Sequence, residues 1–533
     1  QILNWQFTLT PGTYLYNLWS KPSVSIYFNI YLFNITNKEA FLSGEDTKIV
    51  YQEIGPYAFR ETLENTNAIF HKNNTVTYNI KRSYKFDIEK SSGDINSDNV
   101  VTTNMILLGA HTLASKHSVL TELGLSTITK SLQHKTIINM SVSEYLYGHE
   151  DNLLDLGTNF LPFATPFEKF GLFDQFVKRE ENIEVTLTLN ELFDENQDDG
   201  LESRQQEVKE TSTEKPSFHP LDVEYDDDIV EELHDYRDHK THENDFNFDK
   251  PKLFSMRDYS IEFWNGSPYI PGWKDYGINK NHTRCNQISG TFDGFLFSKN
   301  VTKTDNLFVY RPGFCRRLGF HFSHSEYLID GIEVLWFVVD INSLYDHPDN
   351  PETSCYCDKL EKCYQRGIGN ASPCYHDLPV SFSQPHFYDA DPSLLNQFEG
   401  LKPVKEKHQT TFAVQPKLGM NVNFNLRTQM NLMTGKTKFH EEVQRFNDMV
   451  IPVGWFENTL DELTPALELH LKLAMVYLPI LMWILSAIFG MIGTLVLINS
   501  YRKFVRLNHG ESYSVKDIQK NVHFNETKLF IDH

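Results

Sequence analysis

The chain carries two kinds of hydrophobic periodicity. Residues 24–33 (VSIYFNIYLF) and 422–433 (VNFNLRTQMNLM) alternate apolar with polar side chains, the period-2 pattern of a strand that buries one face. Shorter strand-like segments begin at Asn306, Gly331 and Thr410. Between residues 103 and 160 the apolar positions recur at helical spacing and predict three short helices. We therefore expect an α+β protein in which a helical cluster interrupts a largely antiparallel sheet.

The last of these expected helices has defined ends. Ser141 is followed three residues later by Glu144, which is the S-x-x-E pattern of a capping box. Gly148 suits the position just beyond a helix, because glycine adopts a left-handed backbone at low cost. The sequence thus predicts a helix between Ser141 and Gly148.

A long uncharged segment lies near the C-terminus. Residues 473–500 contain no charged side chain and exceed the roughly 20 residues that cross a bilayer. The alternative is a buried core helix, but such helices rarely stay uncharged over this length. We therefore expect a transmembrane helix at residues 471–501.

The charges that follow this segment predict its orientation. Arg502, Lys503 and Arg506 come directly after it, and by the positive-inside rule the tail, residues 502–533, is cytoplasmic. Residues 1–470 then form an extracellular or lumenal domain. The chain opens on QILNWQFTLT, which lacks the basic start and apolar run of a signal peptide. We expect an export signal or membrane anchor upstream of Gln1.

Glycosylation sequons agree with this orientation. Seven N-x-S/T sequons precede the expected span, and they begin at Asn34, Asn73, Asn139, Asn265, Asn281, Asn300 and Asn370. Another begins at Asn525 in the tail and should remain unmodified if the tail is cytoplasmic.

The cysteines gather in one part of the expected exported domain. They are Cys285, Cys315, Cys355, Cys357, Cys363 and Cys374. An even, clustered set in an exported domain indicates a disulfide framework. A zinc site would need paired C-x2-C knuckles, which are missing, and a free catalytic thiol is the other alternative. Spacing alone does not select a pairing.

The composition excludes one class of partner. The formal net charge is −22, and binding of nucleic acid through its phosphates needs a basic face. Residues 191–250 account for most of this charge, with 21 Asp and Glu against 6 Lys and Arg. Few apolar residues interrupt the segment, so it predicts a mobile acidic insert. Its histidines, His234, His239 and His242, offer an adventitious metal site as an alternative, but we expect no metal.

Motifs for catalysis are missing, so we expect no enzyme and no cofactor. The chain has no G-x-S-x-G elbow, H-E-x-x-H pair or phosphate-binding loop. Residues 103–160 do carry basic side chains, which form either a solvated face or a ligand contact; the lysines are Lys116, Lys130 and Lys135. The histidines there, His111, His117 and His134, raise the hypothesis that partner binding depends on pH.

Five segments resemble the class B scavenger receptor family, which includes fatty acid translocase, lysosomal integral membrane protein and insect sensory neuron membrane proteins. They are GPYAFR at Gly55, CNQISGTFDGFLF at Cys285, RPGFCRRLGF at Arg311, SQPHFYDADPSLLNQFEGLKPVKEKHQTTFAVQPKLGM at Ser383 and IPVGWFE at Ile451. The run P-H-F-x-x-A-D-P with its downstream H-x-T is quite specific, and the cysteine order is similar. The resemblance implies an invertebrate member whose first membrane helix lies upstream of Gln1.

The resemblance also implies a fold. We expect a large antiparallel β-barrel-like ectodomain (1–470) with an apical helical bundle (103–160), the acidic insert (191–250), a disulfide-rich region (285–374), a membrane helix (471–501) and a tail (502–533). The implied disulfides are Cys285–Cys355, Cys315–Cys374 and Cys357–Cys363. The lysines named above become candidate ligand contacts at the apex.

The function implied by the resemblance is binding rather than catalysis. We expect a cell-surface or endosomal receptor that binds lipids, fatty acids or lipoproteins and delivers them to the membrane through an ectodomain tunnel. The alternative is a protein-binding or sorting receptor of the endolysosomal system, with protein ligands at the apex. The tail ends NETKLFIDH, which lacks the acidic dileucine signal of the lysosomal relative, so we expect the plasma membrane before the endosome or lysosome.

Overall fold

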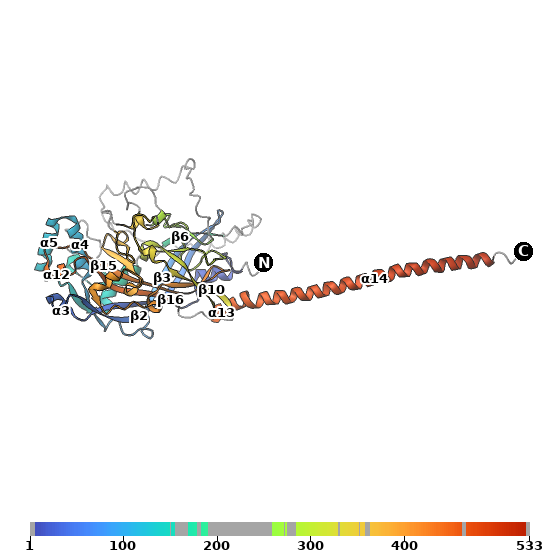
Figure 1. Cartoon of the computed structure of the whole chain (residues 1–533), viewed down its shortest axis with the longest axis horizontal. Helices are drawn as coiled ribbons and strands as arrows, with labels where there is room; N and C mark the ends of the chain where they lie inside the picture. The colour runs from blue at the N-terminus through green and yellow to red at the C-terminus, as the bar shows by residue number, and fades with distance from the viewer. Residues whose placement is uncertain are drawn as a thin grey trace, which may run out of the picture. The chain divides into compact units, whose positions relative to one another are not determined.

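Figure 1 shows the computed structural model of the chain. The described residues are 6–149, 151–154, 169–177, 183–189, 258–270, 272–273, 284–328, 331–350, 352–357, 363–460 and 465–528. The expected acidic insert and Asn281 lie outside them. The chain forms two compact units: the larger comprises Ile2–Ser325 and Leu335–Glu462, and the smaller contains Glu326–Val334 and Leu463–His533.

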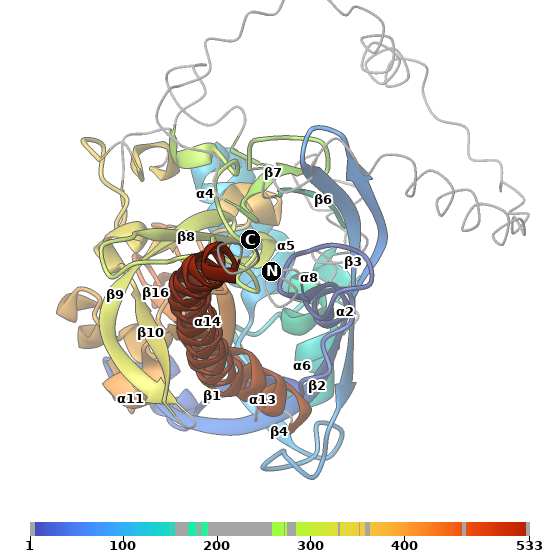
Figure 2. The same cartoon turned by 90° about the vertical axis from the view of Figure 1, so that its right-hand side faces the viewer.

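A large, mainly antiparallel sheet of 14 strands dominates the described residues. Its path runs β7 (Ile261–Trp264), β6 (Ile183–Thr188), β3 (Thr75–Phe86), β2 (Ile49–His71), β1 (Ile26–Ile35), β16 (Val450–Leu460), β15 (Met420–Met433), β14 (Thr411–Gln415), β10 (Ile332–Val339), β9 (Arg316–Leu328) and β8 (Leu307–Arg311). Beside this path lie β11 (Gly369–Asn370), β12 (Val380–Ser383) and β13 (Phe398–Glu399), of which β13 pairs with β2 in parallel. In Figure 2 the strands curve around a common interior, with β2 and β3 on one side and β8 and β9 on the other.

The sheet curls without closing, so the expected barrel is wrong in this respect. Among the described residues its path ends at β7 and β8, which share no ladder. Each edge instead makes a single bridge to the segment between them, Ile261 to Thr291 and Val309 to Phe292. Gly290 and Gly294 flank that segment with φ of 84° and 87°. Such left-handed turns prevent the segment from running straight enough to add a full strand.

The centre of the sheet joins the two ends of the ectodomain sequence. β1 pairs with β2 on one side and with β16 on the other, from Ile26 opposite Leu460 to Leu32 opposite Gly454. Phe28, Ile30 and Leu32 are buried, and the residues between them are less so. The predicted alternation of the first strand is therefore confirmed.

The alternation predicted for residues 422–433 holds for only part of β15. The second half of β15 buries both faces. Gln429 and Asn431, which the pattern places on a wet face, are fully buried. Their amides are satisfied internally: Gln429 Nε2 donates to Asn431 Oδ1 at 2.8 Å, and Asn431 Nδ2 donates to Ser383 Oγ of β12 at 3.1 Å. Polar side chains can line a buried face when they bond one another.

Helices cluster between residues 105 and 147, as predicted. α4 (Met105–His117) and α5 (Val119–Ser131) form a hairpin, and α6 (Val142–Tyr147) follows. α6 has the predicted capping box and ends at Gly148. The second helix was expected over residues 126–135, but α5 both begins and ends earlier than that. The residues that follow enter a small sheet, in which β5 (Ile137–Ser141) pairs with β4 (Asn99–Thr103).

The smaller unit contains the predicted apolar helix. α13 (Pro465–Lys472) continues through a π-helical turn (Leu473–Tyr477) into α14 (Leu478–Lys528). Residues 465–507 are long and apolar enough to cross a membrane. Large side chains such as Trp483 and Phe489 are exposed, which contradicts the alternative of a buried core helix.

Candidate functional site

The cysteines form three disulfides and are therefore structural. They join Cys285 to Cys355, Cys315 to Cys374 and Cys357 to Cys363, with Cα–Cα distances of 6.1, 5.8 and 4.7 Å. These are the pairs that the family resemblance implies. No cysteine is free, so none of the six can act as a metal ligand or a nucleophile.

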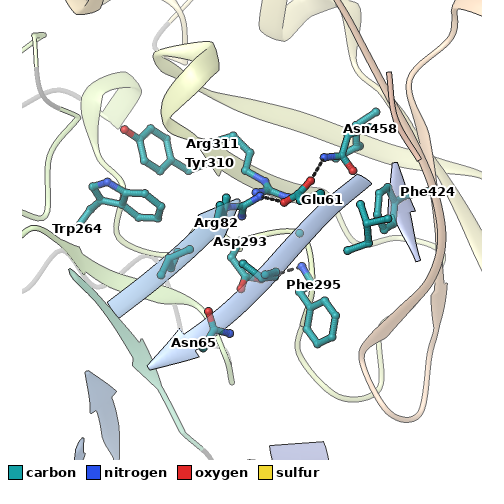
Figure 3. A pocket seen from close by; sticks show the side chains of 15 residues that line it. Glu61, Asn65, Arg82, Trp264, Asp293, Phe295, Tyr310, Arg311, Phe424 and Asn458 are labelled. Carbon is teal, nitrogen blue, oxygen red and sulfur yellow. Dashed lines mark hydrogen bonds and ion pairs between the residues drawn. The ribbon is translucent and has the colours of Figure 1, made fainter. Parts of the chain in front are cut away.

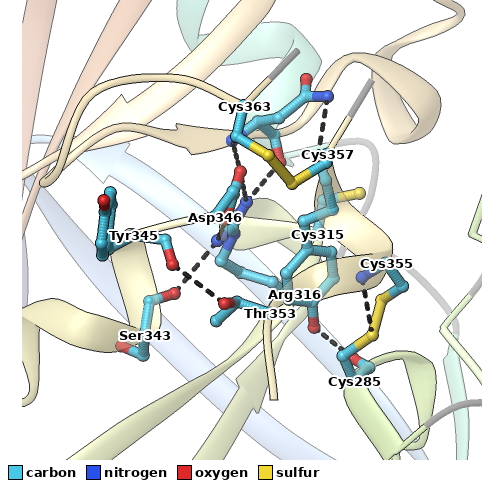
Figure 4. A network of polar contacts seen from close by, with 12 residues as sticks. Cys285, Cys315, Arg316, Ser343, Tyr345, Asp346, Thr353, Cys355, Cys357 and Cys363 are labelled. Carbon is cyan, nitrogen blue, oxygen red and sulfur yellow. Dashed lines mark hydrogen bonds and ion pairs between the residues drawn. A yellow bond between two sulfur atoms is a disulfide. The ribbon is translucent and has the colours of Figure 1, made fainter. Parts of the chain in front are cut away.

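A buried arginine holds the disulfide-rich region together (Figure 4). Arg316 is inaccessible to solvent, and its guanidinium makes a bidentate ion pair with Asp346 at 2.8 and 3.2 Å. It also donates to the carbonyl of Asn370 at 2.9 Å and lies 4.2 Å from the ring centroid of Tyr356. A buried charge with this many partners supports structure rather than ligand binding.

A cavity lies on the inner face of the curled sheet (Figure 3). Its lining comes from both edges of the sheet, through Trp264 of β7 and Arg311 of β8, and from its centre, through Ile26 and Asn458. A second cavity shares part of this lining, including Arg311 and Leu426. Their volumes are about 40 and 30 Å³. Since one water needs roughly 10–15 Å³ by this measure, a larger ligand requires side-chain movement.

Charged side chains at the cavity differ in their partners. Arg82 pairs with Glu61 at 2.6 Å, and Asn458 donates to the other oxygen of Glu61 at 2.7 Å. Asp293 Oδ1 accepts the backbone N–H groups of residues 295 and 296 at 2.8 and 3.2 Å. Burial raises the pKa of Asp293, against the opposing effect of these hydrogen bonds and of the nearby arginines. Arg311 makes no hydrogen bond or ion pair with any described residue, and its Nε is buried.

A second polar cluster brings together motif segments that are far apart in the sequence. His386 Nε2 lies 2.6 Å from Glu53 Oε2, to which Trp455 Nε1 also donates at 2.7 Å. The rings of His386 and His408 stack with centroids 4.3 Å apart. This cluster was not predicted from the sequence, although the motifs PHF, H-x-T and IPVGWFE supply three of its members.

The donor set of this cluster resembles a metal site, but its tautomers do not fit one. Glu53, His386 and His408 place ligand atoms within 4.8 Å of one another. However, His386 Nδ1 accepts the N–H of Lys402 and His408 Nδ1 accepts the N–H of Val404, both at 2.9 Å. Each neutral ring then carries its proton on Nε2, whereas a metal-bound histidine normally donates from its other nitrogen. We therefore assign the cluster to hydrogen bonding that joins the segment around His386 and His408 to strands β2 and β16.

The predicted lysines lie at the helical hairpin and are exposed. Lys116 and Lys130 stand in the last turns of α4 and α5, and Lys135 follows in the next loop. Lys130 Nζ donates to the carbonyl of Phe439 at 2.8 Å, so part of its bonding capacity is used within the protein.

The histidines of this region occupy different environments. His111 is fully buried, with Nε2 3.1 Å from Thr129 Oγ1. Burial lowers the pKa of His111 to about 3, so it stays neutral near pH 5 and cannot be the proposed sensor of ligand binding. His134 is partly buried, with Nδ1 4.0 Å from Asp151 Oδ1, and His117 is exposed.

An apolar surface on α5 was not predicted. Leu120 is 80% exposed, and four further large apolar side chains on or beside the helix are also exposed: Val119, Leu123, Ile128 and Leu132. We call these five residues the α5 patch. Single exposed apolar side chains are ordinary, but five of them on or beside one short helix offer much apolar surface to a partner. The sequence signal is the run VLTELGLSTITKSL, where apolar residues are too numerous for one buried stripe.

The asparagines of the described sequons differ in exposure. Asn73, Asn139, Asn265 and Asn300 are exposed, and Asn34 is partly buried. Asn370 is only 3% exposed, and its Nδ2, the atom that a glycan would occupy, donates to the carbonyl of Tyr356 at 3.3 Å.

We expect Asn370 to carry no glycan, because its amide lies inside the disulfide-rich region. Mass spectrometry of glycopeptides from the secreted or cell-surface receptor checks this, with exposed Asn73 as the occupied reference. A glycan on Asn370 in the folded receptor would contradict the packing around Tyr356.

The fold and its sites define a class of protein. The apolar helix is long enough to anchor the chain in a membrane. The curled, disulfide-bonded sheet contains a cavity that can bind ligands. Together these features are typical of a membrane-bound receptor. The sequence pattern of the CD36 family matches residues 1–503, and the chain belongs to that family. This confirms the resemblance to class B scavenger receptors.

Individual relatives cover most of the chain at low identity. Scavenger receptor class B member 1 of Bos taurus is 26% identical over 452 residues, which is 85% of this chain and 74% of the relative. Lysosome membrane protein 2 of Homo sapiens is 25% identical over 500 residues, which is 93% of this chain and 88% of the relative. Lysosome membrane protein 2 of Mus musculus is similar to the same extent, at 26%.

Proposed function

We propose that this chain is a receptor, not an enzyme, that binds hydrophobic ligands such as lipids, fatty acids or lipoproteins and delivers them towards its membrane. The observation that carries the proposal is the α5 patch. Burial of each of these side chains under an apolar partner contributes about 1.5–3 kcal/mol to the free energy of binding when the side chain is fully covered. Exposed lysines at the same hairpin suit a ligand surface that also carries negative charge.

The cavity inside the sheet supports the delivery step. An acyl chain that travels within the ectodomain avoids a cost of about 0.8 kcal/mol for each CH2 exposed to water. The cavity lining includes Phe424 and Leu426, which are only partly buried and so present apolar surface to the interior. Opening of this interior is the movement that ligand transfer requires.

The proposal includes an orientation and a location. Exposed sequons and three disulfides in the larger unit support its placement in an oxidising, extracellular or lumenal compartment, with the tail in the cytoplasm. We propose the plasma membrane, with endosomes as the alternative.

A protein-binding or sorting receptor of the endolysosomal system is the second candidate. The similarity to lysosome membrane protein 2 over 93% of this chain favours it. The α5 patch would then cover a protein surface rather than a lipoprotein, and no acyl chain would enter the sheet.

The double variant Leu120→Asp with Leu123→Asp tests the role of the patch. In the full chain reconstituted in nanodiscs, we expect binding of lipoprotein particles to weaken by at least about tenfold. Two apolar contacts are lost, and the two aspartates repel a ligand surface that carries negative charge. Ile88→Asp is the matched control, since Ile88 is an exposed apolar residue outside the hairpin. Undiminished binding by the double variant, with both proteins equally folded, would remove the patch from the proposal. Wild-type chain that binds no lipoprotein or lipid would favour the second candidate.

A further inference from the structure

Arg311 is the one charged side chain among those that line the cavity for which the described residues supply neither a hydrogen bond nor an ion pair. Arg82 and Glu61 neutralise each other, and Asp293 bonds backbone N–H groups. The buried Nε of Arg311 lacks an acceptor. A buried donor without a partner destabilises the folded state, and more so when it is charged. Arg311 as a whole is only partly buried, and a bound acceptor would complete the hydrogen bonding of its guanidinium.

The position of Arg311 places it at the meeting point of the two cavities. It lines both of them together with Arg82, Leu426 and Asn458. It is also the last residue of β8, at an open edge of the sheet. A group held by this guanidinium is thus reached from either cavity.

The surroundings of Arg311 favour an amphiphile over a small polar ion. The apolar lining residues of the two cavities include Phe28, Phe314, Phe424, Leu426 and Phe456. Phe314 and Phe424 are only partly buried, although they pack against a buried apolar core. An acyl chain covers such surface, whereas a hydrated anion leaves it in contact with water.

We propose that Arg311 is the head-group receptor of the cavity, and that it selects acyl ligands with a free carboxylate over neutral lipids of the same chain length. This inference rests on the proposed lipid-binding function and deepens it. The planar guanidinium matches a carboxylate with two parallel N–H···O bonds, which a methyl ester cannot reproduce as an anion. The carboxylate would also bond the guanidinium directly, which the nearby Asp293 does not do although it interacts with Arg311 electrostatically.

Binding of palmitate and of methyl palmitate to the full chain in nanodiscs tests this selectivity. We expect the wild type to prefer palmitate by at least about tenfold, the effect of one charge-assisted hydrogen bond. Arg311→Met should abolish the preference because it lowers the affinity for palmitate far more than the affinity for the ester, and Arg311→Lys should retain part of the preference. Arg60→Met is the matched control, because Arg60 is exposed on β2 next to Glu61 in sequence. Acetate should not compete with palmitate.

The outcomes separate the inference from the function on which it rests. If the wild type binds neither probe, the proposed lipid-binding function fails. If it binds acid and ester equally, or if Arg311→Met keeps the preference, lipid binding stands and the role of Arg311 is wrong. Competition by acetate would show a small-anion site and would also overturn the inference.

The ionisation of palmitate bound to the wild type can be measured as well, and this test does not depend on whether the variants fold. Palmitate labelled with ¹³C at its carboxyl group should remain ionised, when bound, to a lower pH than palmitate in the nanodisc lipid, because an arginine favours the charged form. Equal titration in the two environments would count against Arg311 as its partner.

Discussion

Replacing Arg316 by methionine will lower the free energy of unfolding of the ectodomain by about 3–5 kcal/mol, the usual cost of breaking a buried ion pair. The variant leaves Asp346, which is fully buried, without its bidentate partner. It also removes the donor that holds the carbonyl of Asn370 and the cation that lies over Tyr356. Thermal unfolding with the disulfides intact, together with the amount of receptor that reaches the cell surface, measures the effect.

An exposed ion pair provides the matched control. Arg366 pairs with Asp389 at 3.3 Å on the surface, and Arg366→Met should cost less than about 1 kcal/mol. Adding Asp346→Leu to Arg316→Met should recover part of the loss, because an apolar pair of similar volume leaves no buried charge. A single variant Arg316→Met as stable as Arg366→Met would show that the buried network is not needed for folding.

Protonation of His408 and His111 will together contribute a loss of about 4 kcal/mol in the free energy of unfolding when the pH falls from 7.4 to 5. Burial, helped by His386, Arg427 and Lys407 and opposed by Glu53, lowers the pKa of His408 to about 4. Burial, helped by His440 and Lys130, lowers the pKa of His111 to about 3. The imidazole in the unfolded chain has a pKa of about 6.5, so the unfolded state binds more protons than the folded state does. Stability that is complete above this pH is lost as the pH falls towards the folded values.

The variant His408→Asn isolates one half of this effect. Asn can still accept the N–H of Val404, but it does not titrate, so the loss between pH 7.4 and 5 should fall by about 2 kcal/mol. His324→Asn, at an exposed histidine, is the control. Hydrogen bonds from His386 and Trp455 outweigh burial and lower the pKa of Glu53 below its usual 4.5, so its stabilisation is lost only at more acidic pH. An unchanged slope in His408→Asn would contradict a buried, neutral His408.

Features with local causes could be predicted from the sequence. The capping box at Ser141 and Glu144 and the apolar helix after residue 473 depend on neighbours within a few turns, and both are present. The alternation of β1 survives because a single face of that strand meets the core. Family resemblance gave the disulfide pairs, which no spacing rule could supply.

Features that depend on distant partners could not be predicted. The alternation pattern places Gln429 and Asn431 on a solvent-exposed face of the strand. In the structure both side chains are buried and donate hydrogen bonds to Ser383. The hydrogen-bond partner of Glu53 is His386, which lies more than 300 positions away in the sequence, so their contact could not be predicted. The open edges of the sheet follow from two left-handed glycines, whose backbone angles the alternation pattern does not contain. Arg311 was visible only as part of a motif, because a missing partner can be recognised only in three dimensions.

Because β1 pairs with β16, the centre of the sheet cannot form until late in the synthesis of the chain. β1 lies in the middle of the sheet, yet the strand that completes one of its sides ends at Leu460, shortly before the apolar helix. At roughly 5–20 residues per second, a ribosome needs tens of seconds to produce that strand after it has made β1. During this interval the first strands carry an unpaired edge, which is prone to wrong pairing. The pairing at the centre of the sheet can therefore be completed only when translation has almost reached the membrane helix.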